Sequence, residues 1–223
     1  MNVLQKEIHT LQLMKRSHIT ESMIKFHKTV SFILQPLFMP VFGMIMLVNM
    51  DLFSAFSIGW KINAVVGTFV FTALFPAAPI LFMISRGKIH DLFISKKEER
   101  TIPYLFSFIA YLFWTLYLWR ILQFPLSLVA MGIGASISIL TITLINLKWK
   151  ISAHLSGIGG LVGGIFGICY RLGINPTWLY VVILSLSALV AFSRIELKAH
   201  TPQQTLAGFS VGFSAVFFSC ITM

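Results

Sequence analysis

Two histidines and several basic side chains lie in three short polar segments of an otherwise apolar sequence. The segments read KIHDLFISKKEERTIPY (88–104), KWKISAHLSGIGG (148–160) and SRIELKAHTPQQ (193–204). An imidazole titrates near neutral pH, so His154 and His200 could divide the roles of nucleophile and general acid. The accompanying bases suit an anionic phosphate group, and they include Arg100 and Arg194, whose guanidinium groups can hold phosphate in a bidentate manner. This combination predicts phosphate chemistry.

The residues around these histidines also predict helix starts. Thr201 is a good N-cap, Pro202 fits the first helical position, and Gln204 follows the cap by three residues, which completes a capping box. Ser152 can cap a helix that begins at residue 153, and Thr101 can cap another. Because helix N-termini attract anions, three such ends on one face would support a phosphate site.

The composition is that of a membrane protein. The chain has 223 residues, of which 57% are hydrophobic and 11% charged, with a mean hydropathy of +0.86. A helix needs about 20 mostly apolar residues to cross the hydrocarbon layer. The sequence predicts an all-α, polytopic transmembrane bundle of six or seven helices, from seven candidate runs at about 29–49, 62–85, 104–119, 125–147, 153–170, 177–192 and 203–222.

Two further features concern organisation. We expect residues 1–28 to form a polar N-terminal leader or surface helix, and residues 29–223 to form the transmembrane domain that carries the site. In the fifth run, Gly159, Gly163 and Gly167 recur at four-residue spacing. This spacing favours close helix packing in lipid.

The distribution of charge predicts an orientation. With seven spans, the three polar segments and the N-terminus share one side of the membrane, and this side holds 14 of the 17 Lys and Arg residues. The positive-inside rule then places the segments in the cytoplasm. We expect an integral protein of a bacterial inner membrane.

The three segments resemble the motifs of the type 2 phosphatidic acid phosphatase superfamily, which read K-x6-R-P, P-S-G-H and S-R-x5-H-x3-D. The third is the closest match, because Ser193, Arg194 and His200 have the family spacing, while Gln204 stands in place of the aspartate. In the second, Ser152 and His154 match, while Ile151 and Ala153 replace proline and glycine. The resemblance covers about residues 30–222.

The first motif departs further from the family pattern. Arg100 is followed by proline only at position 103, and Phe93 occupies the place of the family lysine. Lys96 or Lys97 would therefore have to replace that lysine.

The resemblance implies a role for each matched residue. His200 would attack phosphorus to form a phosphohistidine, His154 would protonate the leaving alkoxide, and Gln204 would orient His200. The predicted phosphate-binding residues are Arg100, Arg194, Lys97, Lys96, Ser152 and Ser193. The substrate would be a lipid phosphate or an isoprenoid (di)phosphate held within the bilayer, and the reaction would be a metal-independent phosphomonoesterase or pyrophosphatase reaction.

Gln204 leaves an alternative open. A glutamine can accept a hydrogen bond but brings no charge to stabilise an imidazolium, and its carbonyl could be committed to the capping box. A carboxylate could come instead from Asp91, Glu98, Glu99 or Glu196. The alternative function is a catalytically weakened relative that binds phospholipid or polyprenyl-phosphate headgroups as a carrier or scaffold. A third possibility is a transferase that moves the phosphoryl group to an acceptor other than water.

Other function classes find little support in the sequence. The predicted spans contain no Asp or Glu, which argues against a proton-relay or cation-coupled transporter. The sequence lacks a His, Cys and carboxylate cluster with metal-ligand spacing, so we predict neither a metal nor a cofactor. We expect no nucleic-acid partner, and the sequence indicates no oligomeric state.

Overall fold

The chain folds into long helices joined by short helical turns, and the computed structural model describes residues 21–91, 94 and 96–223. Within these residues every regular element is a helix, which confirms the predicted all-α class. After a first helix over residues 21–33, the elements are η1 (Pro36–Phe38), α2 (Met39–Val48), η2 (Asp51–Phe53), α3 (Ile58–Phe69), η3 (Val70–Leu74), α4 (Phe75–Ser85), η4 (Lys97–Glu99), α5 (Thr101–Leu116), η5 (Tyr117–Ile121), α6 (Leu126–Lys148), α7 (Ala153–Leu172), α8 (Thr177–Glu196) and α9 (Pro202–Thr222).

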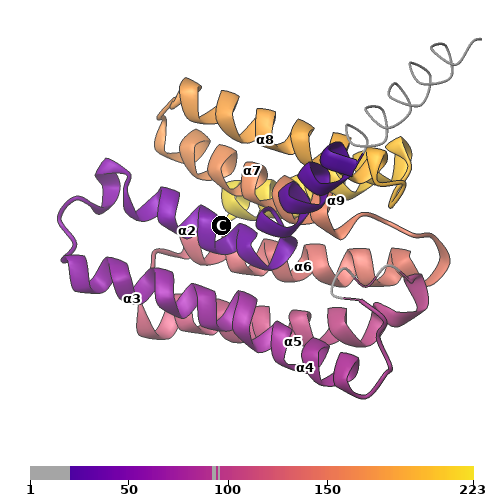
Figure 1. Ribbon diagram of the computed structural model, residues 1–223. Coiled ribbons are helices and arrows are strands. Elements are labelled where there is room, and N and C mark those ends of the chain that lie inside the picture. The colour runs from indigo at the N-terminus through magenta and orange to yellow at the C-terminus, as the bar shows by residue number, and fades with distance from the viewer. Residues whose placement is uncertain (1–20, 92–93, 95) are drawn as a thin grey trace, which may run out of the picture.

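Within the described residues, seven helical stretches are long and apolar enough to cross a membrane, so the protein is an integral membrane protein. They cover Glu21–Val48, Ile58–Ser85, Lys97–Ile121, Leu126–Lys148, Ala153–Leu172, Thr177–Glu196 and Pro202–Thr222. This number is the larger of the two predicted. Figure 1 shows the helices side by side, with α7 and α8 on one side of the bundle, α3, α4 and α5 on the other, and α6 between them.

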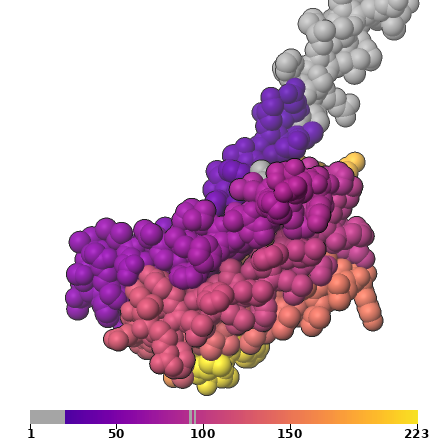
Figure 2. All heavy atoms as spheres, turned by 90° about the horizontal axis from the view of Figure 1, so that it is seen from below, coloured from indigo at the N-terminus to yellow at the C-terminus, as the bar shows by residue number. Residues whose placement is uncertain are grey.

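The first span begins earlier than the apolar run and is interrupted. Residues 21–28 belong to its helix, and Figure 2 shows this helix, in indigo, extending beyond the packed body of the other helices. The helix ends near residue 33, and Pro36 starts the 3-10 turn η1, from which α2 continues. A proline cannot donate to the helical ladder, which explains the break. The division into a leader (1–28) and a domain (29–223) stays a prediction, and residues 1–20 lie outside the described residues.

Helices α7 and α9 pack closely enough for their backbones to touch. A Cβ atom added at Gly159 or Gly163 of α7 would collide with the carbonyl oxygens of Phe209 and Phe213 in α9. The fit is reciprocal, because a Cβ at Gly212 of α9 would collide with the carbonyl oxygen of Ser156 in α7. The glycine spacing in the fifth run therefore serves close helix packing, as predicted. It also brings the N-terminal ends of α7 and α9 together.

This packing gives a stability prediction. Gly163→Ala should lower the free energy of unfolding by about 1–3 kcal/mol, the usual cost of overpacking a close contact. The measurement is reversible unfolding of the purified protein in mixed micelles. Gly59→Ala in α3 is the matched control, because an added Cβ there meets nothing within 4 Å. Equal stability of the two variants would contradict the close-packing account.

Candidate functional site

Arg100 joins the chain before α5 to the chain before α7. Its side chain is buried, with 3% of its surface exposed. The Nε–H group donates to the carbonyl oxygen of Ile94 at 2.7 Å, and Nη1 donates to that of Ile151 at 3.2 Å. Two backbone acceptors thus fix the plane of the guanidinium group, and the side chain lines a cavity within the bundle.

His154 lies in the first turn of α7, as the capping residue before it predicts. Ser152 is the N-cap, and its hydroxyl accepts from the N–H group of Leu155. The His154 ring is buried, and its Nε2 atom lies 3.1 Å from the carbonyl oxygen of Ser31 in the first helix. A carbonyl can only accept a hydrogen bond, so Nε2 carries a proton in this arrangement.

His200 occupies the junction between α8 and α9. The backbone N–H of His200 donates to the carbonyl oxygen of Arg194, which closes the end of α8. The predicted capping box is present at the start of α9, where the Thr201 hydroxyl accepts from the N–H of Gln204 and the Gln204 side chain accepts from the N–H of Thr201. His200 is therefore held just before a well-defined helix start.

The Gln204 carbonyl orients His200 while it completes the capping box. The atom Oε1 accepts from the Thr201 N–H at 3.3 Å and lies 3.0 Å from Nδ1 of His200. Because Oε1 accepts both bonds, Nδ1 must carry the imidazole proton, and the lone pair of Nε2 is available. The capping box thus leaves His200 with an orienting group, contrary to the concern that the sequence raised.

Three positive charges act on His200, and together with burial they lower its pKa to about 3. Burial is the largest cause, followed by the charges of Arg100, Arg194 and Lys150, while the hydrogen bond to Gln204 has the opposite, smaller effect. The imidazole is therefore neutral at physiological pH, as a nucleophile must be. Arg100 of the first motif and Arg194 of the third therefore lie close enough to His200 for their charges to act on it.

The structure directs three of the predicted phosphate-binding side chains toward other groups. The Lys96 ammonium contacts the ring of His90, and that of Lys97 donates to the carbonyl oxygen of Leu147 at 3.4 Å. The Ser193 hydroxyl is fully buried and lies 3.1 Å from Nδ1 of His27. Their predicted role as phosphate ligands stays a prediction.

The acidic side chains near the site pair with bases. Glu99 accepts from the backbone and from the ring of His90, at 3.1 and 2.6 Å. The charges of Glu98 and Asp91 act on Lys150. The group that hydrogen-bonds the His200 ring is the neutral amide of Gln204.

Four residues near the site escaped the sequence reasoning. Lys150 precedes His154 by four residues, and its pKa is lowered by partial burial and by the charges of Arg100 and Arg194. Tyr104 lies beside Arg100 at the cavity.

His27 and Ser31, the other two, come from the first helix. The basic segment KWK could have indicated Lys150, whereas nothing in the sequence pairs the first helix with the motifs.

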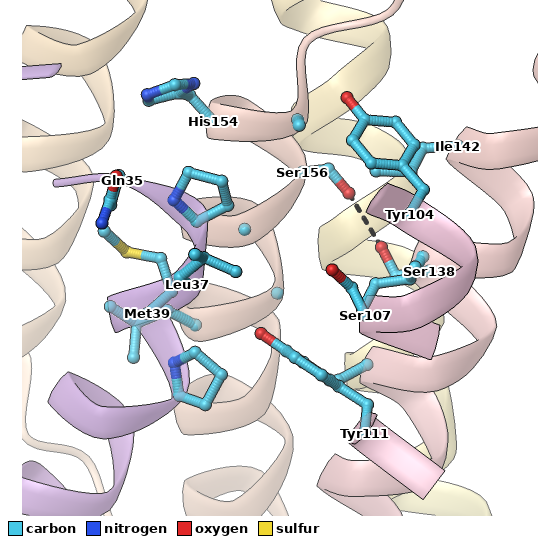
Figure 3. Close-up of a pocket in the computed structure, with 18 of the residues that line it drawn as sticks. Gln35, Leu37, Met39, Tyr104, Ser107, Tyr111, Ser138, Ile142, His154 and Ser156 are labelled. Atoms are coloured by element: carbon cyan, nitrogen blue, oxygen red, sulfur yellow. Dashed lines mark hydrogen bonds between the residues drawn. The ribbon is translucent and has the colours of Figure 1, made fainter. Parts of the chain in front are cut away.

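The cavity runs from these residues into the apolar interior of the bundle. It has a volume of about 150 Å³, and Arg100, His154 and His200 line one end. Figure 3 shows η1 and the start of α2 on one side, facing α5, α6 and α7 on the other. A charged group bound near the histidines would therefore have an apolar space next to it, in which a hydrocarbon chain fits.

The chain matches a known family over its C-terminal third. Residues 146–223 match the family model described as the PAP2 superfamily. This match supports the resemblance of the chain to the type 2 phosphatidic acid phosphatase superfamily. The matched part of the chain contains His154, Arg194, His200 and Gln204, and Arg100, which lies outside it, lines the same cavity as the two histidines. Curated proteins and solved structures gave no significant match.

The contact between His27 and Ser193 gives a second prediction. His27→Phe and Ser193→Ala should each lower the free energy of unfolding, and the double variant should lose less than the sum, by about 0.5–1.5 kcal/mol. Denaturant unfolding in micelles measures the cycle. Lys25→Ala is the control, because the Lys25 side chain is 74% exposed on the same helix. Additive losses would contradict an energetic link between the first helix and the third motif.

The lowered pKa of His200 gives a third prediction. Because the folded pKa (about 3) lies below the ordinary value of 6.5, the unfolded chain takes up this proton first as pH falls. The stability contribution of His200 is therefore complete above about pH 6.5 and declines toward pH 3. Between pH 7 and pH 5, wild type should lose roughly 1–2 kcal/mol more stability than His200→Asn. Parallel curves of unfolding free energy against pH would contradict the burial of an uncharged His200.

Proposed function

We propose that the protein is a membrane phosphatase of the PAP2 superfamily that acts on a lipid phosphate or an isoprenoid (di)phosphate through a phosphohistidine. The observation that carries the proposal is the geometry of His200. Its ring is neutral, its Nδ1 proton is held by Gln204, and its Nε2 lone pair is free to attack. Positive charges from Arg100, Arg194 and Lys150 surround it. Such charges favour the anionic phosphate and the charge that develops in the transition state.

The proposed reaction assigns one step to each histidine. Nε2 of His200 forms a bond to phosphorus while the bond to the leaving oxygen breaks. His154 gives a proton to that oxygen. Since Nε2 of His154 already donates to Ser31, the transferred proton would be carried on Nδ1. Water then attacks phosphorus and gives a proton to Nδ1 of His154, the bond between phosphorus and Nε2 of His200 breaks, and inorganic phosphate leaves.

Gln204 determines how efficient this site can be. Its carbonyl supplies the tautomer and the orientation, but it brings no negative charge to the imidazolium-like ring of the phosphorylated intermediate. In a serine-protease triad, replacing the orienting aspartate by its amide costs about 10⁴ in rate, largely through the wrong tautomer. Here the tautomer is correct, so we expect a slow but real hydrolase. The rival proposal is a headgroup-binding carrier or scaffold, and it rests on the absence of a negative charge at Gln204.

The test is phosphate release by the purified protein in micelles, with a panel of lipid phosphates and isoprenoid phosphates. His200→Ala should abolish release, because no other side chain supplies the attacking nitrogen. Gln204→Asp should raise kcat by about tenfold or more, since a carboxylate also stabilises the charged ring. Gln204→Ala is the matched control and should lower the rate.

The outcomes separate the two proposals. Release that survives His200→Ala would overturn the assigned nucleophile. Headgroup binding without release, in both wild type and Gln204→Asp, would favour the carrier. Location of the site on the cytoplasmic face of a bacterial inner membrane is also proposed, and it is supported by the excess of Lys and Arg on that side.

A further inference from the structure

The cavity has one charged end and one apolar end. Arg100, His154 and His200 line the first, and Trp114, Met131 and Ile165 are among the residues that line the second. His154 and Ile165 are eleven residues apart on α7, which corresponds to roughly 16 Å along a helix. The space is therefore long enough for a phosphate group together with the first part of a lipid chain.

Hydroxyl groups line the middle of this cavity on one side only. Ser107 and Tyr111 come from α5, Ser138 from α6 and Ser156 from α7. Figure 3 shows the hydroxyls of Ser107 and Tyr111 pointing into the space toward η1 and α2, and those of Ser138 and Ser156 pointing toward one another. The opposite wall is mainly apolar, with Pro36, Leu37, Met39 and Pro40. A purely hydrocarbon chain would make no use of the polar side.

The hydrogen bonds of these hydroxyls leave donors to spare. Ser107 donates to the carbonyl oxygen of Pro103 at 2.9 Å. Ser138 and Ser156 lie 2.8 Å apart and share one hydrogen bond, so one of their two O–H groups remains for another acceptor. The Tyr111 side chain is 5% exposed and lines the cavity, and Figure 3 draws no hydrogen bond from its hydroxyl to the other residues shown. A buried donor without an acceptor costs free energy, so the set is suited to a ligand oxygen.

The distance of these donors from the charged end of the cavity limits which oxygen of the ligand can reach them. Ser156 is two residues beyond His154 on α7, and Tyr111 is seven residues, or roughly 10 Å, beyond Tyr104 on α5. In a glycerol-based lipid phosphate, six or seven bonds separate phosphorus from the ester carbonyl oxygens, or roughly 7 Å at about 1.2 Å per bond. An isoprenoid chain carries no acceptor at this distance.

We propose that Tyr111, together with the Ser138–Ser156 pair, forms a subsite that donates a hydrogen bond to an ester carbonyl oxygen of the bound lipid. Tyr111 is then a specificity-determining residue, which favours ester-linked lipid phosphates over isoprenoid phosphates. The inference rests on the proposed function for the identity of the charged group. The subsite itself is a matter of binding and can be measured without hydrolysis.

Binding of three phosphonate lipids that cannot be hydrolysed tests the subsite. The probes are a dioctanoyl glycerol ester, the corresponding dioctyl ether and a geranylgeranyl phosphonate, each measured with the full-length protein in the same micelles. Wild type should bind the ester about two- to tenfold more tightly than the ether, the range expected for one net hydrogen bond. Tyr111→Phe should abolish this preference and leave the Kd of the ether unchanged within twofold.

A matched tyrosine controls for general effects. Tyr170 lies at the far end of α7 and is 73% exposed, so Tyr170→Phe should keep the preference for the ester. Equal binding of ester and ether by wild type would overturn the proposal. A loss of affinity for all three probes in Tyr111→Phe would do the same, because it would indicate a structural role for the hydroxyl.

The same preparation separates this inference from the proposed function. Phosphate release from the hydrolysable dioctanoyl ester reports on the phosphatase, and the Kd values report on the subsite. A preference for the ester without phosphate release would overturn the phosphatase and support the subsite. Phosphate release with no preference for the ester would support the phosphatase and overturn the subsite.

Discussion

The backbone contact between α7 and α9 is the constraint on which the site depends. Both candidate catalytic histidines lie at the N-terminal ends of these helices, 46 residues apart in the sequence. Glycines on the facing sides let the two backbones touch. At the site end, the N–H group of Ser152 donates to the carbonyl oxygen of Gln204 at 3.3 Å, which ties the first turn of α9 to the N-cap of α7. The separation of the two imidazole rings is thus set by main chain.

Gln204 shows how a neutral side chain can keep part of a charged residue's role. Its single oxygen serves a helix N-terminus and a histidine ring at once. Orientation and tautomer need only an acceptor, whereas stabilisation of a positive ring needs charge as well. The positive charges of Arg100, Arg194 and Lys150 act on His200, and the group that hydrogen-bonds its ring is a neutral amide and not a carboxylate. His200 therefore stays neutral well below physiological pH.

Local sequence signals were sufficient for much of this structure. The apolar runs, the capping box at Thr201 and the glycine spacing in α7 each report on neighbouring residues, and each was confirmed. Family spacing indicated His154 and His200, which line one cavity. The first helix could not be linked to them, because the contact between His27 and Ser193 joins residues 166 positions apart. Lys97 and Lys150 show the same limit, since only packing decides which lysine charge acts on His200.

The interrupted first span contacts both His154 and the apolar wall of the cavity. Its N-terminal helix supplies the Ser31 carbonyl that holds His154, and only four residues later Gln35 and Pro36 line the cavity. One short stretch of main chain therefore joins the wall of the cavity at η1 to the carbonyl group that contacts His154. Under the proposed function, a ligand with a hydrocarbon chain would touch both this wall and the charged end of the cavity, whereas a bare phosphate ion would touch the charged end alone.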